Sequence, residues 1–146
     1  MGKKITLEQI KQTVSMVEKA GIQTYAYYVI GLPWETQETL EETFKFAKNL
    51  NTHFATFYTT TALMGTKYFE YAKKNRLGDI NYEKPYVFPS VKSYELSSQE
   101  IYEYNKKFNR EYYLRPRYIF KMAREINSIT KFKTYYDTFI KLMKKM

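Results

Sequence analysis

The chain has 146 residues, room for one domain of ordinary size, and its hydrophobic fraction of 44% excludes a disordered composition. It has no cysteine, which excludes disulfides, thiolate zinc sites and an iron–sulfur cluster bound by its own thiolates. No apolar run approaches the roughly 20 residues that span a bilayer, and residues 1–6 have no signal-peptide pattern. A cytoplasmic location is therefore expected.

The net charge of +9 is unevenly placed along the chain. Residues 1–105 carry 12 Lys or Arg against 12 Asp or Glu, whereas residues 106–146 carry 12 against 3. A neutral globular segment is thus followed by a basic helical one. The abundance of Lys, Asn, Tyr, Phe and Ile also suits an AT-rich genome, so the basicity has a compositional explanation beside a functional one.

The first half of the chain alternates helix and strand patterns. Thr6 and Gln9 form a capping-box pattern before a helix that Gly21 ends. Residues 22–30 carry β-branched and aromatic side chains at both odd and even positions. This pattern predicts a strand that is covered on both faces. A tight turn over 31–35 leads to a helix capped by Thr36.

A second strand is predicted over 53–60 and a short helix over 67–75. The order helix, strand, helix, strand, helix predicts parallel strands with right-handed crossovers, an α/β fold. Two parallel strands cover little apolar surface and expose two edges. The chain therefore reads as part of a larger sheet, and an isolated chain is expected to self-associate or fold marginally.

The second half is predicted to be a loop over 78–90 followed by helices. Ser97 and Glu100 form another capping-box pattern, and the helix that follows is interrupted at Pro116. Apolar positions at helical spacing predict a further helix over 118–126 and a last one over 132–143.

Four short motifs, in this order and spacing, resemble radical S-adenosylmethionine (radical SAM) enzymes. The subfamily resembled often carries an N-terminal cobalamin-binding domain. The motifs are the strand and turn over 21–36, the loop and helix start over 61–70, the helix start over 96–100 and the Tyr-Leu-Arg-Pro stretch over 113–118. Residues 62–64, Ala-Leu-Met, depart from the usual Pro-Tyr-Pro, and the cluster-binding CxxxCxxC segment is absent.

The resemblance implies that residues 1–78 are the last βα units of a partial TIM-type barrel and that residues 79–146 are a loop and a basic helical C-terminal extension. It implies cofactors for the parent enzyme: S-adenosylmethionine, a [4Fe–4S] cluster and, in part of the family, cobalamin. By the same resemblance, one segment would flank the adenine of S-adenosylmethionine: Val29, Ile30, Gly31, Leu32, Pro33 and Glu35. No catalytic residue, metal ligand or cofactor is assigned to this chain alone.

The function implied is that of a piece of a radical SAM oxidoreductase or methyltransferase, inactive alone, from a truncated or split gene. Its partner would be the missing N-terminal half, and the parent would act on a small molecule. Structural roles compete for several residues: Trp34 in packing, His53 as a polar residue at a strand edge, Arg115 and Arg117 in pairs with carboxylates. The alternative is a non-catalytic basic module that contacts RNA or an anionic membrane surface through residues 106–146, where no specific motif supports either.

Overall fold

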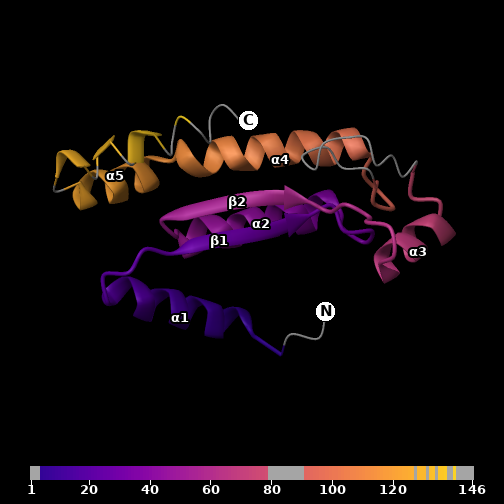
Figure 1. Cartoon of the computed structure of the whole chain (residues 1–146), viewed down its shortest axis with the longest axis horizontal. Coiled ribbons are helices and arrows are strands. Elements are labelled where there is room, and N and C mark those ends of the chain that lie inside the picture. Colours follow the sequence, from indigo (N-terminus) through magenta and orange to yellow (C-terminus); the bar gives the residue numbers. More distant parts are fainter. Residues whose placement is uncertain are drawn as a thin grey trace.

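A computed structural model of the chain describes residues 4–78, 91–126, 128–130, 132–133, 135–137 and 140 (Figure 1). The elements are α1 (Leu7–Lys19), β1 (Tyr25–Ile30), α2 (Gln37–Leu50), β2 (Phe54–Thr59), α3 (Lys67–Lys74), α4 (Ser98–Tyr113) and α5 (Pro116–Glu125). Of these elements, none is a helix long and apolar enough to cross a membrane.

The predicted helix starts are confirmed. Thr6, Thr36 and Ser97 each cap a helix through a capping box in which the side chains of the cap and of the third helical residue bond reciprocally. Strand β1, by contrast, begins three residues later than predicted. The N–H of Ile22 donates to the carbonyl of Val17 at 3.2 Å, which closes the end of α1 in a Schellman arrangement and takes this residue out of the strand.

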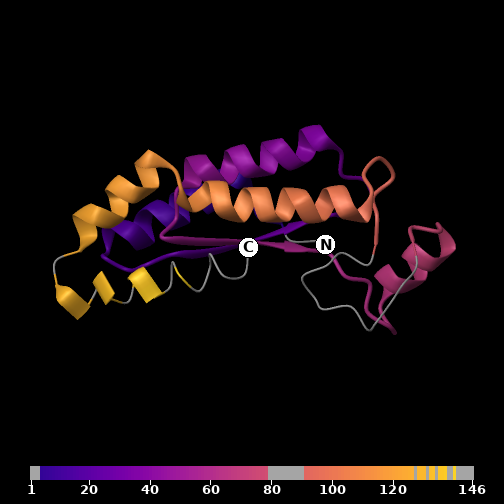
Figure 2. The same ribbon diagram turned by 90° about the horizontal axis from the view of Figure 1, so that it is seen from above.

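The two strands pair in parallel, from Tyr25 opposite Phe54 to Ile30 opposite Thr59, as the helix–strand order predicted. Helices α2 and α4 lie on the same side of this sheet (Figure 2). There the rings of Phe44 from α2 and Phe108 from α4 stack at 4.4 Å between centroids. This side holds the main apolar core of the described residues.

The opposite face of the sheet is open, so the prediction of a strand covered on both faces is wrong. Tyr27 is 64% exposed, Val29 46% and Tyr58 50%. The rings of Tyr25 and Tyr27 stack on each other at 4.6 Å between centroids. The alternating side chains of a strand point to opposite faces, and both α2 and α4 pack on the same one.

The prediction of two unpaired sheet edges is wrong for β2. Helix α4 runs along the outer edge of β2 and its polar side chains bond the backbone there. Tyr113 accepts from the N–H of Ala55 at 3.0 Å and donates to its carbonyl at 2.6 Å. Asn109 accepts from the N–H of Phe57 at 3.1 Å, and Asn105 donates to the Phe57 carbonyl at 2.6 Å. This edge is closed to a further strand.

Parts of two predictions lie outside the described residues. The predicted loop over 78–90 is described only at Gly78. Of the predicted last helix, positions 132–133, 135–137 and 140 are helical, and Phe139 and Met143 lie outside the described part.

Candidate functional site

The six residues that the resemblance assigned to the adenine form one turn at the carboxyl end of β1. In parallel α/β sheets, ligands sit at the carboxyl ends of the strands. The turn is held by the chain that follows β2. The carbonyl of Ile30 accepts from the N–H of Thr60 at 2.8 Å, and the carbonyl of Pro33 accepts from the N–H of Tyr94 at 2.7 Å.

The carboxylate of Glu35 folds back into this turn. One of its oxygens accepts from the N–H of Gly31 and from that of Leu32, the latter at 2.8 Å. Only 8% of Glu35 is exposed. Burial raises the pKa of the Glu35 carboxyl above its usual value, while the two backbone hydrogen bonds act in the opposite direction. Glu35 therefore braces the turn and occupies the two amides that a ligand could otherwise use.

Gly31 occupies a place where a side chain has no room. Its φ of +84° lies in the left-handed region. An added Cβ would lie 2.8 Å from the Cγ2 of Ile101 on α4 and 3.3 Å from the Oγ1 of Thr60. The Thr60 hydroxyl also donates to the Gly31 carbonyl. The close approach that the glycine permits is thus made by α4 and the loop after β2.

The structure therefore divides the predicted site. Ile30, Gly31, Pro33 and Glu35 are buried and build the turn, whereas Val29 is exposed on the open face of the sheet and Leu32 is half-buried. The surface left to a ligand at this turn is apolar, which suits contact with the flat face of a base. Trp34, expected to pack, is instead 64% exposed beside it.

Sequence reasoning missed three residues that shape the turn. Thr60, Tyr94 and Ile101 come from the loop after β2, from the segment before α4 and from α4 itself. The contact of Ile101 with the turn has no local signal in the sequence. Thr60 directly follows β2, but its bond to the end of β1 could be predicted only if the parallel register of the two strands were known.

The Tyr-Leu-Arg-Pro stretch has a structural role. Arg115 donates to the carbonyls of Tyr112 and Lys48 at 2.8 and 2.7 Å and to the side-chain oxygen of Asn51 at 3.3 Å. Its guanidinium lies 4.2 Å from the centroid of the Tyr112 ring. Burial lowers the pKa of Arg115. The expected carboxylate pair is replaced by carbonyls in the last turns of α2 and α4, which carry partial negative charge.

A second polar cluster surrounds His53 at the opposite end of the sheet. The residue is only 5% exposed, not a residue of an open strand edge. Its Nε2 lies 3.0 Å from a carboxylate oxygen of Glu125 and its Nδ1 3.2 Å from one of Glu18. Lys121 donates to both oxygens of Glu18 at 2.9 Å. The cluster ties α1, β2 and α5 together.

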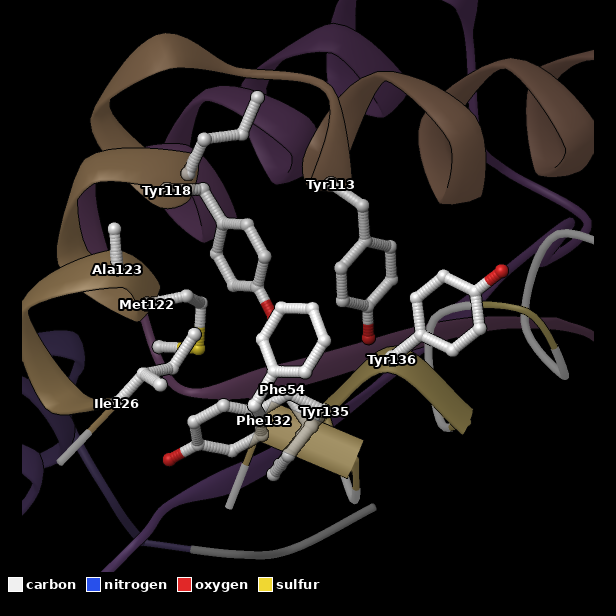
Figure 3. A pocket seen from close by; sticks show the side chains of 10 residues that line it. Phe54, Tyr113, Tyr118, Met122, Ala123, Ile126, Phe132, Tyr135 and Tyr136 are labelled. Atoms are coloured by element: carbon white, nitrogen blue, oxygen red, sulfur yellow. The ribbon is translucent and has the colours of Figure 1, made fainter. Parts of the chain in front are cut away.

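An apolar pocket of about 230 Å³ lies next to this cluster, between α5 and the described positions of the C-terminal segment (Figure 3). The rings of Phe54, Tyr113 and Tyr118 point into it. The Tyr113 and Tyr118 hydroxyls are already bonded to the backbone of β2 and of His53. The pocket would therefore offer a ligand mainly apolar contact.

The described residues contain no group of three or more His, Cys, Asp or Glu that could hold a metal ion. A [4Fe–4S] cluster needs three thiolates, and the sequence has no cysteine, so this chain does not fit that group. Of the six residues at this turn, only Val29 and Leu32 keep exposed surface, and both side chains are apolar.

The fold and the turn define an α/β protein segment with a candidate ligand site at the carboxyl end of a parallel strand. Comparison with known proteins narrows this class. An uncharacterized methyltransferase of Pyrococcus horikoshii is 35% identical over 123 residues, which are 83% of this chain and 27% of that protein.

Two anaerobic magnesium-protoporphyrin IX monomethyl ester cyclases also match. That of Rubrivivax gelatinosus is 43% identical over 51 residues, covering 35% of this chain and 9% of the cyclase. That of Cereibacter sphaeroides is 27% identical over 114 residues, covering 77% and 18%. No family profile and no solved structure matches. The chain spans about a quarter or less of each relative, and these similarities support a radical SAM-related family.

Proposed function

We propose that this chain forms the last βα units and C-terminal extension of a radical SAM oxidoreductase or methyltransferase, and that it works with a separate cluster-binding part. The observation that carries the proposal is the asymmetry of the sheet. Helix α4 closes the edge of β2, as expected for the last strand of an open barrel, while β1 has no strand on its other side among the described residues.

The names of the relatives support the same reaction classes. One is a methyltransferase and two are cyclases acting on a magnesium-porphyrin ester. In the assembled enzyme, the cluster-binding part would cleave S-adenosylmethionine. Val29 and Leu32 would contact the adenine, and Glu35 and Gly31 would hold the turn in place.

The alternative, a basic module that contacts RNA or an anionic surface through residues 106–146, has less support. Lys107 donates to Glu41 at 2.9 Å, and Arg115 and Lys121 are bonded within the chain. These three cations of the region 106–146 are therefore committed to internal contacts.

The test begins with the DNA upstream of the codon for Met1. We expect an in-frame stretch, a frameshifted stretch or a neighbouring gene to encode a CxxxCxxC segment. That polypeptide is then co-produced with this chain, reconstituted anaerobically with iron and sulfide, and assayed under dithionite for 5′-deoxyadenosine. Formation that requires both polypeptides supports the proposal. The proposal is contradicted if the cluster-binding polypeptide alone forms 5′-deoxyadenosine at the same rate. It is also contradicted if no 5′-deoxyadenosine forms when both polypeptides are present.

A further inference from the structure

We propose that the apolar pocket between α5 and the described C-terminal positions binds a small, uncharged aromatic molecule of about two fused rings. This site lies at the opposite end of the sheet from the turn at Gly31. Phe54, which lines the pocket, is the first residue of β2, whereas Gly31 follows the last residue of β1. The inference is independent of the proposed function, and it concerns binding alone.

The walls of the pocket come from four parts of the chain that are distant in the sequence (Figure 3). Among the lining residues, Phe54 belongs to β2, Tyr113 to α4, Met122 to α5 and Phe132 to the C-terminal segment. Most of these lining side chains are aromatic, and aromatic rings pack favourably on the edges and faces of other rings. The sulfur of Met122 adds a contact that also favours a ring. The walls therefore suit an aromatic ligand better than an aliphatic one.

Three tyrosine rings in these walls are held at both ends. The hydroxyls of Tyr113 and Tyr118 donate to backbone carbonyls at 2.6 and 2.9 Å. The hydroxyl of Tyr135 donates to a carboxylate oxygen of Glu125 at 3.2 Å and accepts from the side chain of Gln23. Each ring is fixed by its own backbone at one end and by another part of the chain at the other, so it does not turn inward to fill the space. Walls that are ordered before binding lose little conformational entropy when a ligand enters.

The pocket wall is uncharged at neutral pH. The described residues that line it include no Asp, Glu, Lys, Arg or His. Burial raises the pKa of the Tyr113, Tyr118 and Tyr135 phenols, so all three stay protonated. A phosphate, carboxylate or sulfonium group would lose its water here without gaining an opposite charge. The wall therefore disfavours S-adenosylmethionine and nucleotides and favours a neutral molecule.

The volume of the pocket sets the size of the ligand. A dry apolar cavity of about 150 Å³ holds one benzene ring. With about 230 Å³, this pocket has room for a second fused ring. Ile119, Phe132 and Tyr136 line it and are each about half exposed, so a ligand can enter from solvent between α5 and the C-terminal positions.

The test uses two probes of similar size that differ in charge: 2-naphthol, which is neutral at neutral pH, and naphthalene-2-sulfonate, an anion. The full chain, with carbon-13 in its methionine methyl groups, is titrated with each probe by NMR. We expect the Met122 signal to shift and to saturate at one molecule of 2-naphthol per chain. Met16 and Met64, 65% and 70% exposed and outside the pocket, are internal controls. The sulfonate should bind about tenfold more weakly, since its charge would be desolvated.

A pair of substitutions tests the wall itself. Phe132→Ala removes one lining ring, and Phe120→Ala is the matched control, because Phe120 is similarly exposed but does not line the pocket. We expect Phe132→Ala to weaken the binding of 2-naphthol about fivefold and Phe120→Ala to leave it unchanged. Both side chains are already about half exposed, so neither substitution should unfold the chain. Thermal unfolding followed by circular dichroism checks this.

Any other outcome overturns the assignment of this pocket. Equal affinities for the two probes, or a Met122 signal that does not move, would show that the chain binds aromatic molecules elsewhere or not at all. Equal weakening by the two phenylalanine substitutions would also place binding elsewhere. An affinity for 2-naphthol that falls as the chain concentration rises would mean that a second copy covers the pocket. None of these results bears on 5′-deoxyadenosine formation, so the proposed function is tested separately.

Discussion

The side-chain amide nitrogen of Asn105 lies 2.6 Å from the carbonyl oxygen of Phe57, so a helix residue occupies a position at the edge of β2 that a neighbouring strand would use. Asn105 is polar although it lies buried on the core side of α4, between Ile101 and Phe108. A polar residue in such a place is stable only when its hydrogen bonds are made. The pair marks β2 as the last strand of its sheet.

We expect Asn105→Ala to lower the free energy of unfolding by about 1–3 kcal/mol, since it leaves a buried carbonyl short of a donor. The loss should fall toward the lower end because Asn109 also reaches the Phe57 carbonyl, at 3.2 Å. Urea denaturation followed by circular dichroism measures it. Gln99→Ala, on the exposed side of α4, is the matched control, and an equal effect of the two substitutions would show that the edge bond contributes nothing.

Alanine substitutions at two glycines would distinguish the cost of backbone strain from the cost of a steric clash. Gly31 and Gly65 both have left-handed φ values, +84° and +81°, but an added Cβ meets Ile101 at 2.8 Å in the first case and nothing within 4 Å in the second. Gly65→Ala should cost about 1 kcal/mol of backbone strain, and Gly31→Ala about 1–3 kcal/mol more for overpacking. Thermal and urea unfolding of both variants test the difference, which equal losses would refute.

Glu35 should make the stability of the chain pH-dependent. Its folded-state pKa is raised above the ordinary value of 4.5, so the folded state holds the proton more tightly than the unfolded state. This contribution is fully present below the unfolded pKa and declines as the pH rises through the folded pKa. Glu35→Gln keeps an oxygen for the two amides and has no charge. We expect its free energy of unfolding to vary less with pH above about 4.5 than that of the parent, in urea titrations at a series of pH values.

Glu35→Ala provides the complementary measurement. It removes the acceptor of two backbone N–H groups in a buried turn, so it should destabilise the chain at every pH, by about 1–3 kcal/mol. A Glu35→Gln variant as unstable as Glu35→Ala would mean that the charge, not the acceptor, holds the turn.

The sequence predicted what local patterns determine. The capping residues Thr6, Thr36 and Ser97 located three helices because each satisfies amides within its own turn. The parallel pairing followed from the element order, since a crossover helix favours it.

What remained unpredicted depends on partners distant in the chain. Tyr25, Tyr27 and Tyr28 look alike in the sequence, and only the placement of α2 and α4 decides which of them face solvent. Asn105 stands 48 positions from the Phe57 carbonyl that explains it. Glu35 is different, because its partners Gly31 and Leu32 are local, but an acid before a helix suits both the helix dipole and a turn.

The contact between Glu18 and Lys121 should fasten α1 to α5. Lys121 donates to both carboxylate oxygens of Glu18 at 2.9 Å and to the Asn51 carbonyl at 2.8 Å. Burial opposes ionisation of Glu18, but the hydrogen bonds from Lys121 and Thr24 outweigh it, so the pKa of Glu18 is lowered. Both side chains are mostly shielded from solvent. A pair of this kind is coupled more strongly than an exposed one.

A double-mutant cycle with Glu18→Gln and Lys121→Met measures this coupling, which we expect to be about 0.5–3 kcal/mol at neutral pH. The sign of its pH dependence follows from the lowered pKa: the stabilisation is present above the ordinary value of 4.5 and is lost as the pH falls through the folded-state pKa. The exposed pair Glu8 and Lys11, 3.4 Å apart on α1, is the matched control and should show weak coupling. Equal coupling energies for the two pairs, or a Glu18–Lys121 coupling that persists in acid, would show that α1 is held by its other contacts.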